Sequence, residues 1–318
     1  MRVALLHDDV LGRTDASPDE LGVLEAVEAI GGALAELGHV PRYVPVGDRL
    51  DEWLRALREA DIELVFNLCE GVAGSSAGEV GVASVVELLG LPMTGSPAET
   101  LALARRKDRV NALLAAAGLP VPAWTLAERL NGATGWRRFP AIVKPAAEDA
   151  SVGISQASVA ADDAALRHVI ATSRHAPLLV QEFIAGREFN VGIVGAAVLP
   201  VAEIEFSSLT GGGWPLVSYR AKWEEGSDED RATTPRCPAA LDPAWEEQAR
   251  SLARAAWTLV DGRGYGRVDL RADAAGRLHV LEVNPNPDLS PSAGLARMAH
   301  AAGWSYPELI GRIVEEAT

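Results

Sequence analysis

The sequence has few cysteines, few lysines and no long hydrophobic run. Cys69 and Cys237 are too few to form a disulfide framework in 318 residues, so we expect a reducing, cytoplasmic environment. No apolar run reaches the ~18 residues that a membrane helix needs, and no basic, signal-like segment opens the chain, so no membrane partner is expected. Hydrophobic residues make up 48% and charged residues 23%. These proportions and the length predict a globular protein of two or three domains.

Positive charge is scarce. The formal net charge is −15, which argues against a nucleic-acid partner and requires any phosphate site to be built locally. Of the 29 basic residues only Lys107, Lys144 and Lys222 are lysines. In a chain that otherwise uses arginine, a lysine suggests a site that needs a compact charge, although chance retention explains each lysine equally well.

Strands and helices alternate through the first ~95 residues, which predicts a parallel sheet. Its ligand-binding edge, at the carboxyl ends of the strands, would carry His7, the segment 8–20 and the segment 67–79. The glycine-rich turn at 71–78 lacks the spacing of a dinucleotide fingerprint or a P-loop, so nicotinamide binding is not expected. The expected strands are 3–7, 39–46 and 62–68, and the expected helices are 20–38, 48–60 and one that ends at Leu89.

Two of the three lysines lie in the next part, which we expect to be a small α+β unit. Lys107 lies in a predicted helix, and Lys144 lies near the end of a buried strand, where it either snorkels to the surface or binds an anion. Backbone amides in the following loop can cradle phosphate, although its composition also suits an ordinary flexible turn. The expected elements are a linker at 90–97, a helix at 98–117, a strand at 139–145, the loop at 146–155, a helix at 162–174 and a strand at 178–183.

The last part begins near Gly186 with a predicted hairpin of strands 187–195 and 197–206. The segment 207–236 that follows is long and rich in glycine. Long loops inside compact domains are uncommon and often act as lids, which is the role we expect here. Its acidic run at 224–230 is most simply a solvated face. Helices are expected at 243–260 and 306–316.

The stretch 266–290 predicts two strands joined by a two-residue turn at 275–276. This register places Asp269 opposite Glu282 on one face, with Cβ atoms roughly 5 Å apart, and Asn284 points the same way. Burying two opposed carboxylates is unfavourable unless a cation neutralises them. Two carboxylates and an amide suit Mg²⁺. The alternative is a hairpin whose polar face is simply exposed to solvent.

Four segments, in this order and spacing, resemble the ATP-grasp superfamily and within it the D-alanine–D-alanine ligases. They are LGLPMTGSPAETLALARRKDRVNALLAAAGLPVP, FPAIVKPAAEDASVGIS, LVQEFIAGREFNV and GRVDL with LEVNPNPDLSPS. The resemblance spans nearly the whole chain and implies an α/β fold, with an α+β C-terminal half. The implied parts are a Rossmann-like domain (1–95), a central ATP-grasp subdomain (96–184) and a C-terminal ATP-grasp subdomain (185–318) with the lid at 207–236. The nucleotide would lie between the last two.

The resemblance also implies roles for matched residues. Arg267, on the strand face of Asp269, matches the arginine that stabilises the reacting acyl group, with Lys222 and Ser151 as further catalytic residues. The implied magnesium ligands are Asp269, Glu282 and Asn284, for two Mg²⁺ ions or for Mn²⁺ in their place. The implied ATP contacts are Lys107, Lys144, Glu148, Ser151, Val152, Gln181, Glu182, Ile184, Glu188 (to the ribose) and Lys222.

The implied reaction joins a small-molecule carboxylate to an amine. The carboxylate attacks the γ-phosphate of ATP, while magnesium, the lysines and Arg267 offset the developing charge. The resulting acyl phosphate must be kept from water, which is a task for the lid. An amine then attacks it and yields an amide, ADP and phosphate. Relatives in this family are commonly dimers, so a homodimer is expected.

The positions that hold the first substrate depart from the family. There, a glutamate on the first-domain loop, a serine of the phosphate loop and a tyrosine of the lid form a clamp over the first D-alanine. Here Ala150 stands at the serine position and Trp223 at the tyrosine position. The glutamate corresponds to Asp19 or Glu20, between which the sequence does not decide. Asp149 adds a carboxylate to a loop that should meet phosphates.

The positions for the second substrate also differ. Asp288 stands where the family has glycine, and the pair 293–294 replaces a Ser-Leu segment. Asp288 either receives a cationic amine or is an ordinary turn residue after a proline. The predicted substrate contacts are His7, Glu20, Trp223, Asp288 and Ser292.

Three hypotheses follow from this pattern. The first is a carboxylate–amine ligase for amino acids or small peptides other than two D-alanines, for which D-alanine would be a poor substrate. The second is a genuine D-alanine–D-alanine ligase with an altered clamp. The third is a non-catalytic ATP-binding regulatory protein.

Overall fold

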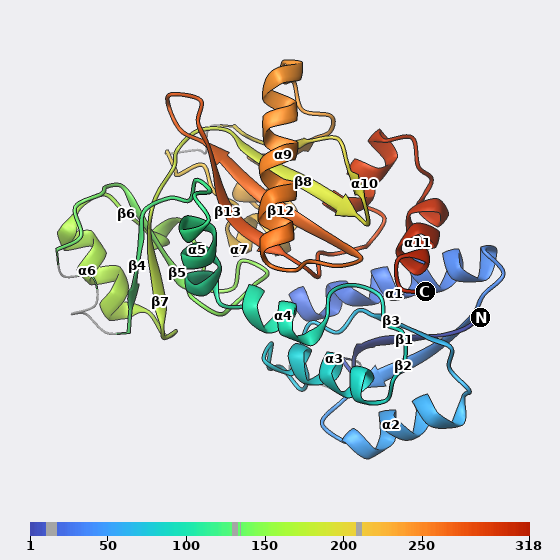
Figure 1. The fold of residues 1–318 in the computed structure, drawn as a ribbon. Helices are drawn as coiled ribbons and strands as arrows, with labels where there is room; N and C mark the ends of the chain where they lie inside the picture. The colour runs from blue at the N-terminus through green and yellow to red at the C-terminus, as the bar shows by residue number, and fades with distance from the viewer. Residues whose placement is uncertain (11–17, 129–132, 134, 208–211) are drawn as a thin grey trace.

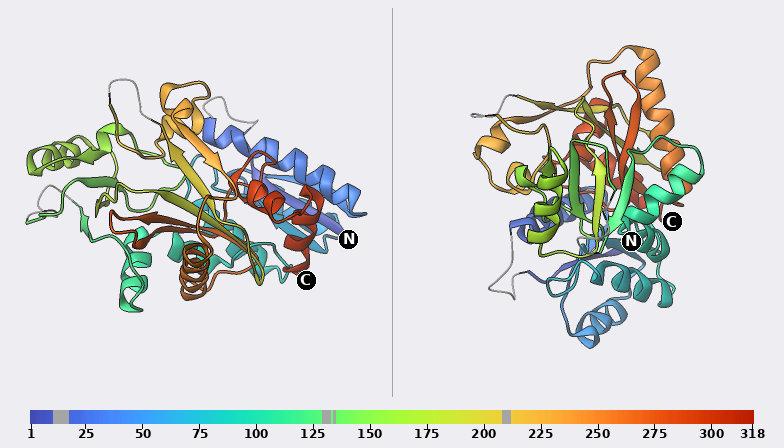
Figure 2. Two further views of the ribbon diagram at one scale, coloured as in Figure 1. Left: turned by 90° about the horizontal axis from the view of Figure 1, so that it is seen from above. Right: turned by 90° about the vertical axis from the view of Figure 1, so that its left-hand side faces the viewer.

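The computed structural model describes residues 1–10, 18–128, 133, 135–207 and 212–318. It forms three parts, each built on its own sheet (Figure 1). In Figure 1 the first part lies at the bottom, the second at the left and the third at the top. Helix α6 (Asp163–Thr172) lies at the far end of the molecule from both termini (Figure 2). Within the described residues, no helix is long and apolar enough to cross a membrane.

The first part is a parallel three-stranded sheet in the order β2-β1-β3, as the sequence predicts. Alternate residues of β1 enter different cores: Val3 and Leu5 pack toward α1, and Ala4 and Leu6 pack with residues of α2 and α3. Burial on both faces explains the continuous apolar run of β1. The elements are β1 (Arg2–Asp8), α1 (Pro18–Glu36), β2 (Val40–Val46), α2 (Leu50–Glu59), β3 (Leu64–Asn67) and α3 (Gly78–Leu88).

The second part is an antiparallel sheet in the order β4-β7-β5-β6, with α6 over one face. Strand β4 was not predicted. Its elements are α4 (Ala98–Ala104), α5 (Lys107–Ala116), β4 (Trp124–Ala127), β5 (Ala141–Pro145), a short 3₁₀ helix (Gln156–Ser158), β6 (Val159–Ala160), α6 and β7 (Leu178–Glu182).

The single helix predicted over 98–117 is wrong, because the helix breaks between α4 and α5. Arg106 has φ −97° and ψ 82°, outside the helical region. The backbone N–H of Lys107 instead donates to the carbonyl of Ala146, at 3.0 Å. The break therefore starts α5 against the loop that follows β5, and it brings Lys107 to that loop.

The third part is a sheet whose main path runs β11-β10-β8-β12-β13, with α9 packed on one face. On its other side, α10 and α11 join the core that also contains α1 and β1. At Gly192 the sheet and α10 approach closely, because a Cβ there would lie 2.6 Å from Leu295. The elements are β8 (Glu188–Val194), β9 (Ala197–Val198), β10 (Ala202–Phe206), α7 (Tyr219–Trp223), α8 (Asp228–Arg231), β11 (Thr233–Arg236), α9 (Pro243–Leu259), β12 (Tyr265–Ala272), β13 (Leu278–Asn284), α10 (Gly294–Ala301) and α11 (Tyr306–Glu315).

The expectation of a structureless segment over 207–236 is also wrong. Its described residues include α7, α8 and the edge strand β11, which pairs with β10. Residues 208–211 lie outside the described part. Helix α10, which begins at the predicted 293–294 pair, was not foreseen either.

In the β12–β13 hairpin, the predicted pairing is confirmed but the predicted turn is wrong. Asp269 pairs with Glu282, and further toward the turn Arg271 pairs with His279. The turn has three residues, 274–276, rather than two, because the N–H of Asp273 donates to the carbonyl of Arg277. A bulge between Asp269 and Leu270 shifts the register by one residue and restores the predicted pair.

Candidate active site

The three predicted metal ligands lie on one face of the β12–β13 hairpin. Asp269 is 8% exposed, so the alternative of a solvent-facing polar surface does not hold. The Asp269 carboxylate accepts two hydrogen bonds from Arg267, at 2.7 and 2.9 Å, and one from Asn190, at 2.8 Å. No group of three or more His, Cys, Asp or Glu side chains in the described residues offers a competing metal site. Two carboxylates and the amide of Asn284 have the oxygen donors that Mg²⁺ prefers.

Lys107 connects this hairpin to the phosphate loop. Its ammonium lies 2.6 Å from Glu282, donates to the carbonyl of Glu148 at 2.8 Å, and forms an ion pair with Asp149. Burial alone would lower the pKa of Lys107, but the two carboxylates raise it above its usual range. Asp149, the carboxylate that looked out of place in this loop, thus neutralises a buried lysine.

Lys144 has no such partner. Its side chain is buried on β5, and its ammonium makes no hydrogen bond or ion pair with any residue that the structure describes. Burial lowers the pKa of Lys144. A buried cation without a counter-ion is unfavourable, so this position suits a site that receives an anion. The anion-binding interpretation of Lys144 is therefore favoured over snorkelling.

Gln181 lies on the same sheet face as Lys144. Residues paired across β5 and β7 share a face, and Ile142 pairs with Gln181 two positions from Lys144. The Gln181 side chain is 1% exposed, and its Nε2 has no hydrogen-bond partner. An orphaned buried amide beside an orphaned ammonium fits a ligand with both polar ring atoms and phosphates. These residues therefore fit ATP.

Other predicted nucleotide contacts have different surroundings. The Glu182 side chain lies on the opposite face of β7 and pairs with Arg138, at 3.3 Å. Ile184 is buried just beyond β7. Glu188 is buried on β8 and forms an ion pair with Arg271, at 3.5 Å. Burial raises the pKa of Glu188, and Arg271 opposes this shift.

The lid closes directly onto the phosphate loop. Ala150 and Ser151 both have positive φ, 54° and 61°, an unusual conformation for residues with a side chain. The Ser151 hydroxyl donates to the carbonyl of Val217, at 3.1 Å, and the indole N–H of Trp223 donates to the carbonyl of Ala150, at 3.0 Å. A Cβ at Gly22 of α1 would lie 2.9 Å from the Trp223 ring. Trp223 is thus the point where the lid, the phosphate loop and the first part meet.

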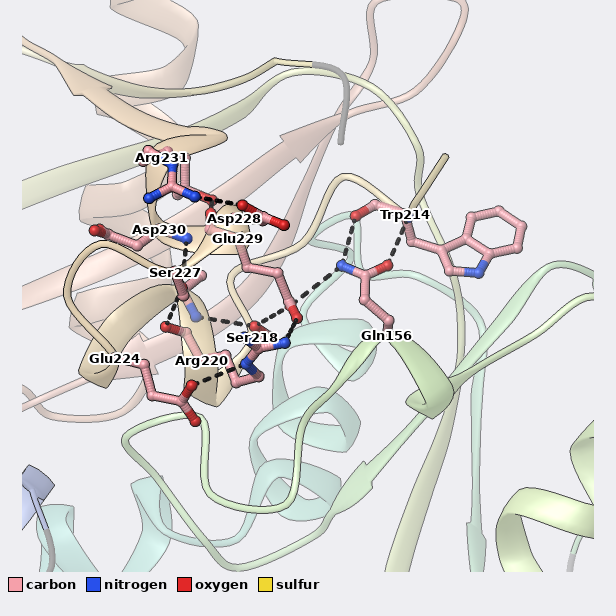
Figure 3. A network of polar contacts seen from close by, with 12 residues as sticks. Gln156, Trp214, Ser218, Arg220, Glu224, Ser227, Asp228, Glu229, Asp230 and Arg231 are labelled. Atoms are coloured by element: carbon pink, nitrogen blue, oxygen red, sulfur yellow. Dashed lines mark hydrogen bonds and ion pairs between the residues drawn. The ribbon is translucent and has the colours of Figure 1, made fainter. Parts of the chain in front are cut away.

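A second set of contacts holds the lid farther from the cavity (Figure 3). The Gln156 amide accepts from the backbone N–H of Trp214, at 2.7 Å, and donates to the carbonyl of the same residue, at 3.2 Å. Glu229 of α8 accepts from Ser218, at 2.5 Å, and lies 3.5 Å from Gln156 (Figure 3). One side chain of the second part therefore binds two turns of the lid.

We expect Gln156→Ala to loosen the lid while the fold is kept. Two lost hydrogen bonds contribute about 1–3 kcal/mol to closure, so amide hydrogen exchange over 214–236 should become about ten- to a hundred-fold faster. Hydrogen–deuterium exchange followed by mass spectrometry measures this. Gln248→Ala, on the exposed side of α9, is the matched control and should leave the exchange unchanged. Unchanged exchange in both variants would contradict a latch at Gln156.

A cavity of about 570 Å³ lies beside these groups and is lined by all three parts. This volume falls within the roughly 300–1,000 Å³ typical of small-molecule pockets. Its charged and aromatic lining includes Asp8, Glu70, Lys222, Trp223, Arg267 and Asp288. Glu148, Val152 and Asn284 line it as well, so it adjoins the phosphate loop and the hairpin.

The predicted substrate residues are only partly brought together. Trp223 and Asp288 line the cavity. His7 is buried at the end of β1, with its Nδ1 3.0 Å from the carbonyl of Asp8, and Ser292 is exposed before α10; neither lines the cavity. Glu20 lies in the first turn of α1, and its side chain is outside the described part.

Two cavity residues were not singled out from the sequence, Glu70 and Glu79. Burial raises the pKa of Glu79 to about 8, although Asn286 donates to its carboxyl group, at 3.1 Å, and opposes the shift. Glu79 is therefore mainly protonated at neutral pH. Both residues belong to the segment 67–79 that the sheet topology placed at the binding edge, which was the available signal.

Comparison with known proteins identifies the family. A family model described as D-ala D-ala ligase C-terminus matches residues 113–315, more than half of the chain. The chain belongs to the D-alanine–D-alanine ligase family. A D-alanine–D-alanine ligase of Alcanivorax borkumensis is 31% identical over 295 residues, covering 92% of this chain and 88% of the relative. One of Halorhodospira halophila is 32% identical over 320 residues, covering 99% and 96%.

A solved structure supports the same fold. The D-alanine–D-alanine ligase of Bacillus anthracis complexed with ATP superposes with a TM-score of 0.79 at 19% identity, covering 100% of this chain and 97% of that one. The predicted ATP-grasp fold is thus confirmed. The chain is an ATP-dependent carboxylate–amine ligase of the D-alanine–D-alanine ligase type, from a family of amide-bond-forming enzymes that use ATP and divalent metals.

Proposed function

We propose that this ligase joins a small carboxylate, activated as an acyl phosphate, to an amine, and that its substrates are not two D-alanines. Support for the ATP-dependent step comes chiefly from Lys144, a buried ammonium without a partner beside the orphaned amide of Gln181. Lys107 and Lys222 complete a set of three cations around the phosphate loop. In a chain with a net charge of −15, this concentration of lysines is local and specific.

The hairpin residues have roles that follow from their contacts. When bound, ATP supplies the phosphoryl group that activates the carboxylate, and Mg²⁺, two ions in our proposal, offsets phosphate charge. Asp269, Glu282 and Asn284 would hold the metal. Arg267 uses two N–H groups on Asp269 and also lines the cavity, so its other N–H groups remain for the acyl group of the substrate.

The substrate side supports an acyl donor other than D-alanine. Ala150 has no hydroxyl, and the indole N–H of Trp223 is already bound to the carbonyl of Ala150. Neither residue therefore offers the side-chain hydrogen bonds expected of the family's clamp. The second hypothesis, a genuine D-alanine–D-alanine ligase, is supported by the names of the curated relatives at 31–32% identity.

We expect D-alanine to be a poor substrate at both positions. A site built around a hydrogen bond loses roughly ten- to several hundred-fold in rate when the bond is missing. Coupled detection of ADP release with a panel of amino acids, in both enantiomers, measures this. Turnover with D-alanine alone at ~1–10³ per second would support the altered-clamp hypothesis instead. ADP release with no member of the panel would favour the regulatory hypothesis.

Two further expectations stay predictions. The homodimer follows from the resemblance to dimeric relatives, and the cytoplasmic location follows from the two unpaired cysteines. Within the described residues Cys69 and Cys237 are both free.

A further inference from the structure

The Glu70 side chain lies in the middle of the cavity wall. It follows β3 in the first part, lines the cavity and makes no hydrogen bond or ion pair with any described residue. The charges that act on it most strongly are those of Lys222, Asp288, Asp8 and Asp149. These four residues come from the lid, the C-terminal part, the first part and the phosphate loop. Glu70 therefore faces the space that a substrate must occupy.

Negative charge at this point has no adequate counter-ion. Burial raises the pKa of Glu70 to about 7, and the nearby charge of Asp288 raises it further, while Lys222 opposes the shift. Asp288 accepts hydrogen bonds from the N–H and the hydroxyl of Ser290, at 2.8 and 3.1 Å, but no described cation forms an ion pair with it. Two carboxylates thus share one lysine.

That lysine has another task in the proposed function. Lys222 would contact the nucleotide phosphates, and its ammonium also lies 4.7 Å from the centre of the Trp223 ring. When phosphate takes up the charge of Lys222, Glu70 and Asp288 lose their only strong counter-charge. A positively charged group of the substrate would then be stabilised between them.

The distance from the reacting centre indicates which part of a substrate this is. The reacting carboxylate must lie near Arg267, whose strongest charged neighbours are Asp269, Glu282 and Glu188. Glu70 belongs to a different group of charges. It therefore contacts a part of the substrate away from the bond that forms.

We propose that Glu70, together with Asp288, is a specificity-determining residue that selects a substrate with a cationic side chain, such as a diamino acid or a guanidino amino acid. The inference rests on the proposed ligase function and names the substrate class for the same cavity. It also gives a physical role to Asp288, which the sequence alone left open between a substrate contact and a turn residue.

The test compares matched cationic and neutral substrates. Lysine and norleucine have side chains of similar length, as do arginine and citrulline, and each is supplied in both enantiomers, singly and in pairs, with ATP and Mg²⁺. We expect kcat/KM from ADP release to be highest for a cationic member. Glu70→Gln, which keeps size but removes charge, should lower kcat/KM for that substrate about ten- to a hundred-fold and change that for its neutral counterpart by less than about three-fold.

Two controls keep the outcomes distinct. Glu59→Gln, an exposed carboxylate on α2, should change neither value. If Glu70→Gln is poorly folded, Glu70→Asp keeps the charge and should retain the preference for the cationic substrate at reduced kcat/KM. Equal use of neutral and cationic substrates by the wild type, with no selective effect of Glu70→Gln, would overturn the inference and leave the ligase function standing. Absence of ADP release with every pair would overturn both.

Discussion

Asp269→Asn should lower kcat by about a hundred- to ten-thousand-fold, because a metal-holding carboxylate contributes several kcal/mol to charge stabilisation in the transition state. The same change removes the counter-charge of Arg267, so the free energy of unfolding should also fall, by roughly 3 kcal/mol. Asparagine keeps an oxygen that can accept from Asn190 or Arg267, so the hairpin should still form. Steady-state ADP release and thermal unfolding measure the two effects.

The matched control separates loss of stability from loss of activity. Glu203 is a buried carboxylate on β10 of the same sheet, and Arg187 binds it with two hydrogen bonds of 2.6 Å. Glu203 does not line the cavity. Glu203→Gln should therefore lower the unfolding temperature while kcat stays within about two-fold. Full activity in Asp269→Asn, or an equal loss of kcat in Glu203→Gln, would refute the metal-ligand role.

The central hairpin shows how far local reasoning reached. The pairing of Asp269 with Glu282 could be predicted because alternation and turn residues restrict an antiparallel register to few choices. The turn length could not, because two- and three-residue loops with glycine both fit the sequence. The prediction of the pair held only because the bulge after Asp269 compensates for the longer turn. Bulges depend on the packing of both faces, which one strand pattern does not reveal.

Tertiary contacts explain the other differences. The run from Ala98 to Ala117 favours a continuous helix by local propensity, and the break at Arg106 arises from a hydrogen bond to a residue 39 positions later. Glu70 was not singled out because an isolated carboxylate in a turn resembles any solvated loop residue. Only the assembled cavity shows that charges from three other parts surround it.

Lys144 offers an effect of opposite sign on stability and on ligand binding. Without ligand its charge is buried and has no partner among the described residues, so Lys144→Met should raise the unfolding temperature. The pKa of Lys144 lies below 10.5 in the folded protein, so its charge opposes folding most at pH values below that lowered pKa. The stability difference between the variant and the wild type should therefore shrink as pH rises toward 10.5.

The same substitution should weaken ATP binding. A hydrogen bond to a charged group contributes about 1.5–3 kcal/mol, so the Kd for ATP should rise about ten- to a hundred-fold in Lys144→Met, and ATP should stabilise this variant less than the wild type. Lys144→Arg keeps the charge but should also raise the Kd, because the planar guanidinium does not fit a pocket built for an ammonium. Calorimetric titration measures both, with Arg109→Gln on the exposed side of α5 as the control. A structural role for Lys144 predicts the reverse pattern, in which Lys144→Met lowers the unfolding temperature and leaves the Kd for ATP unchanged.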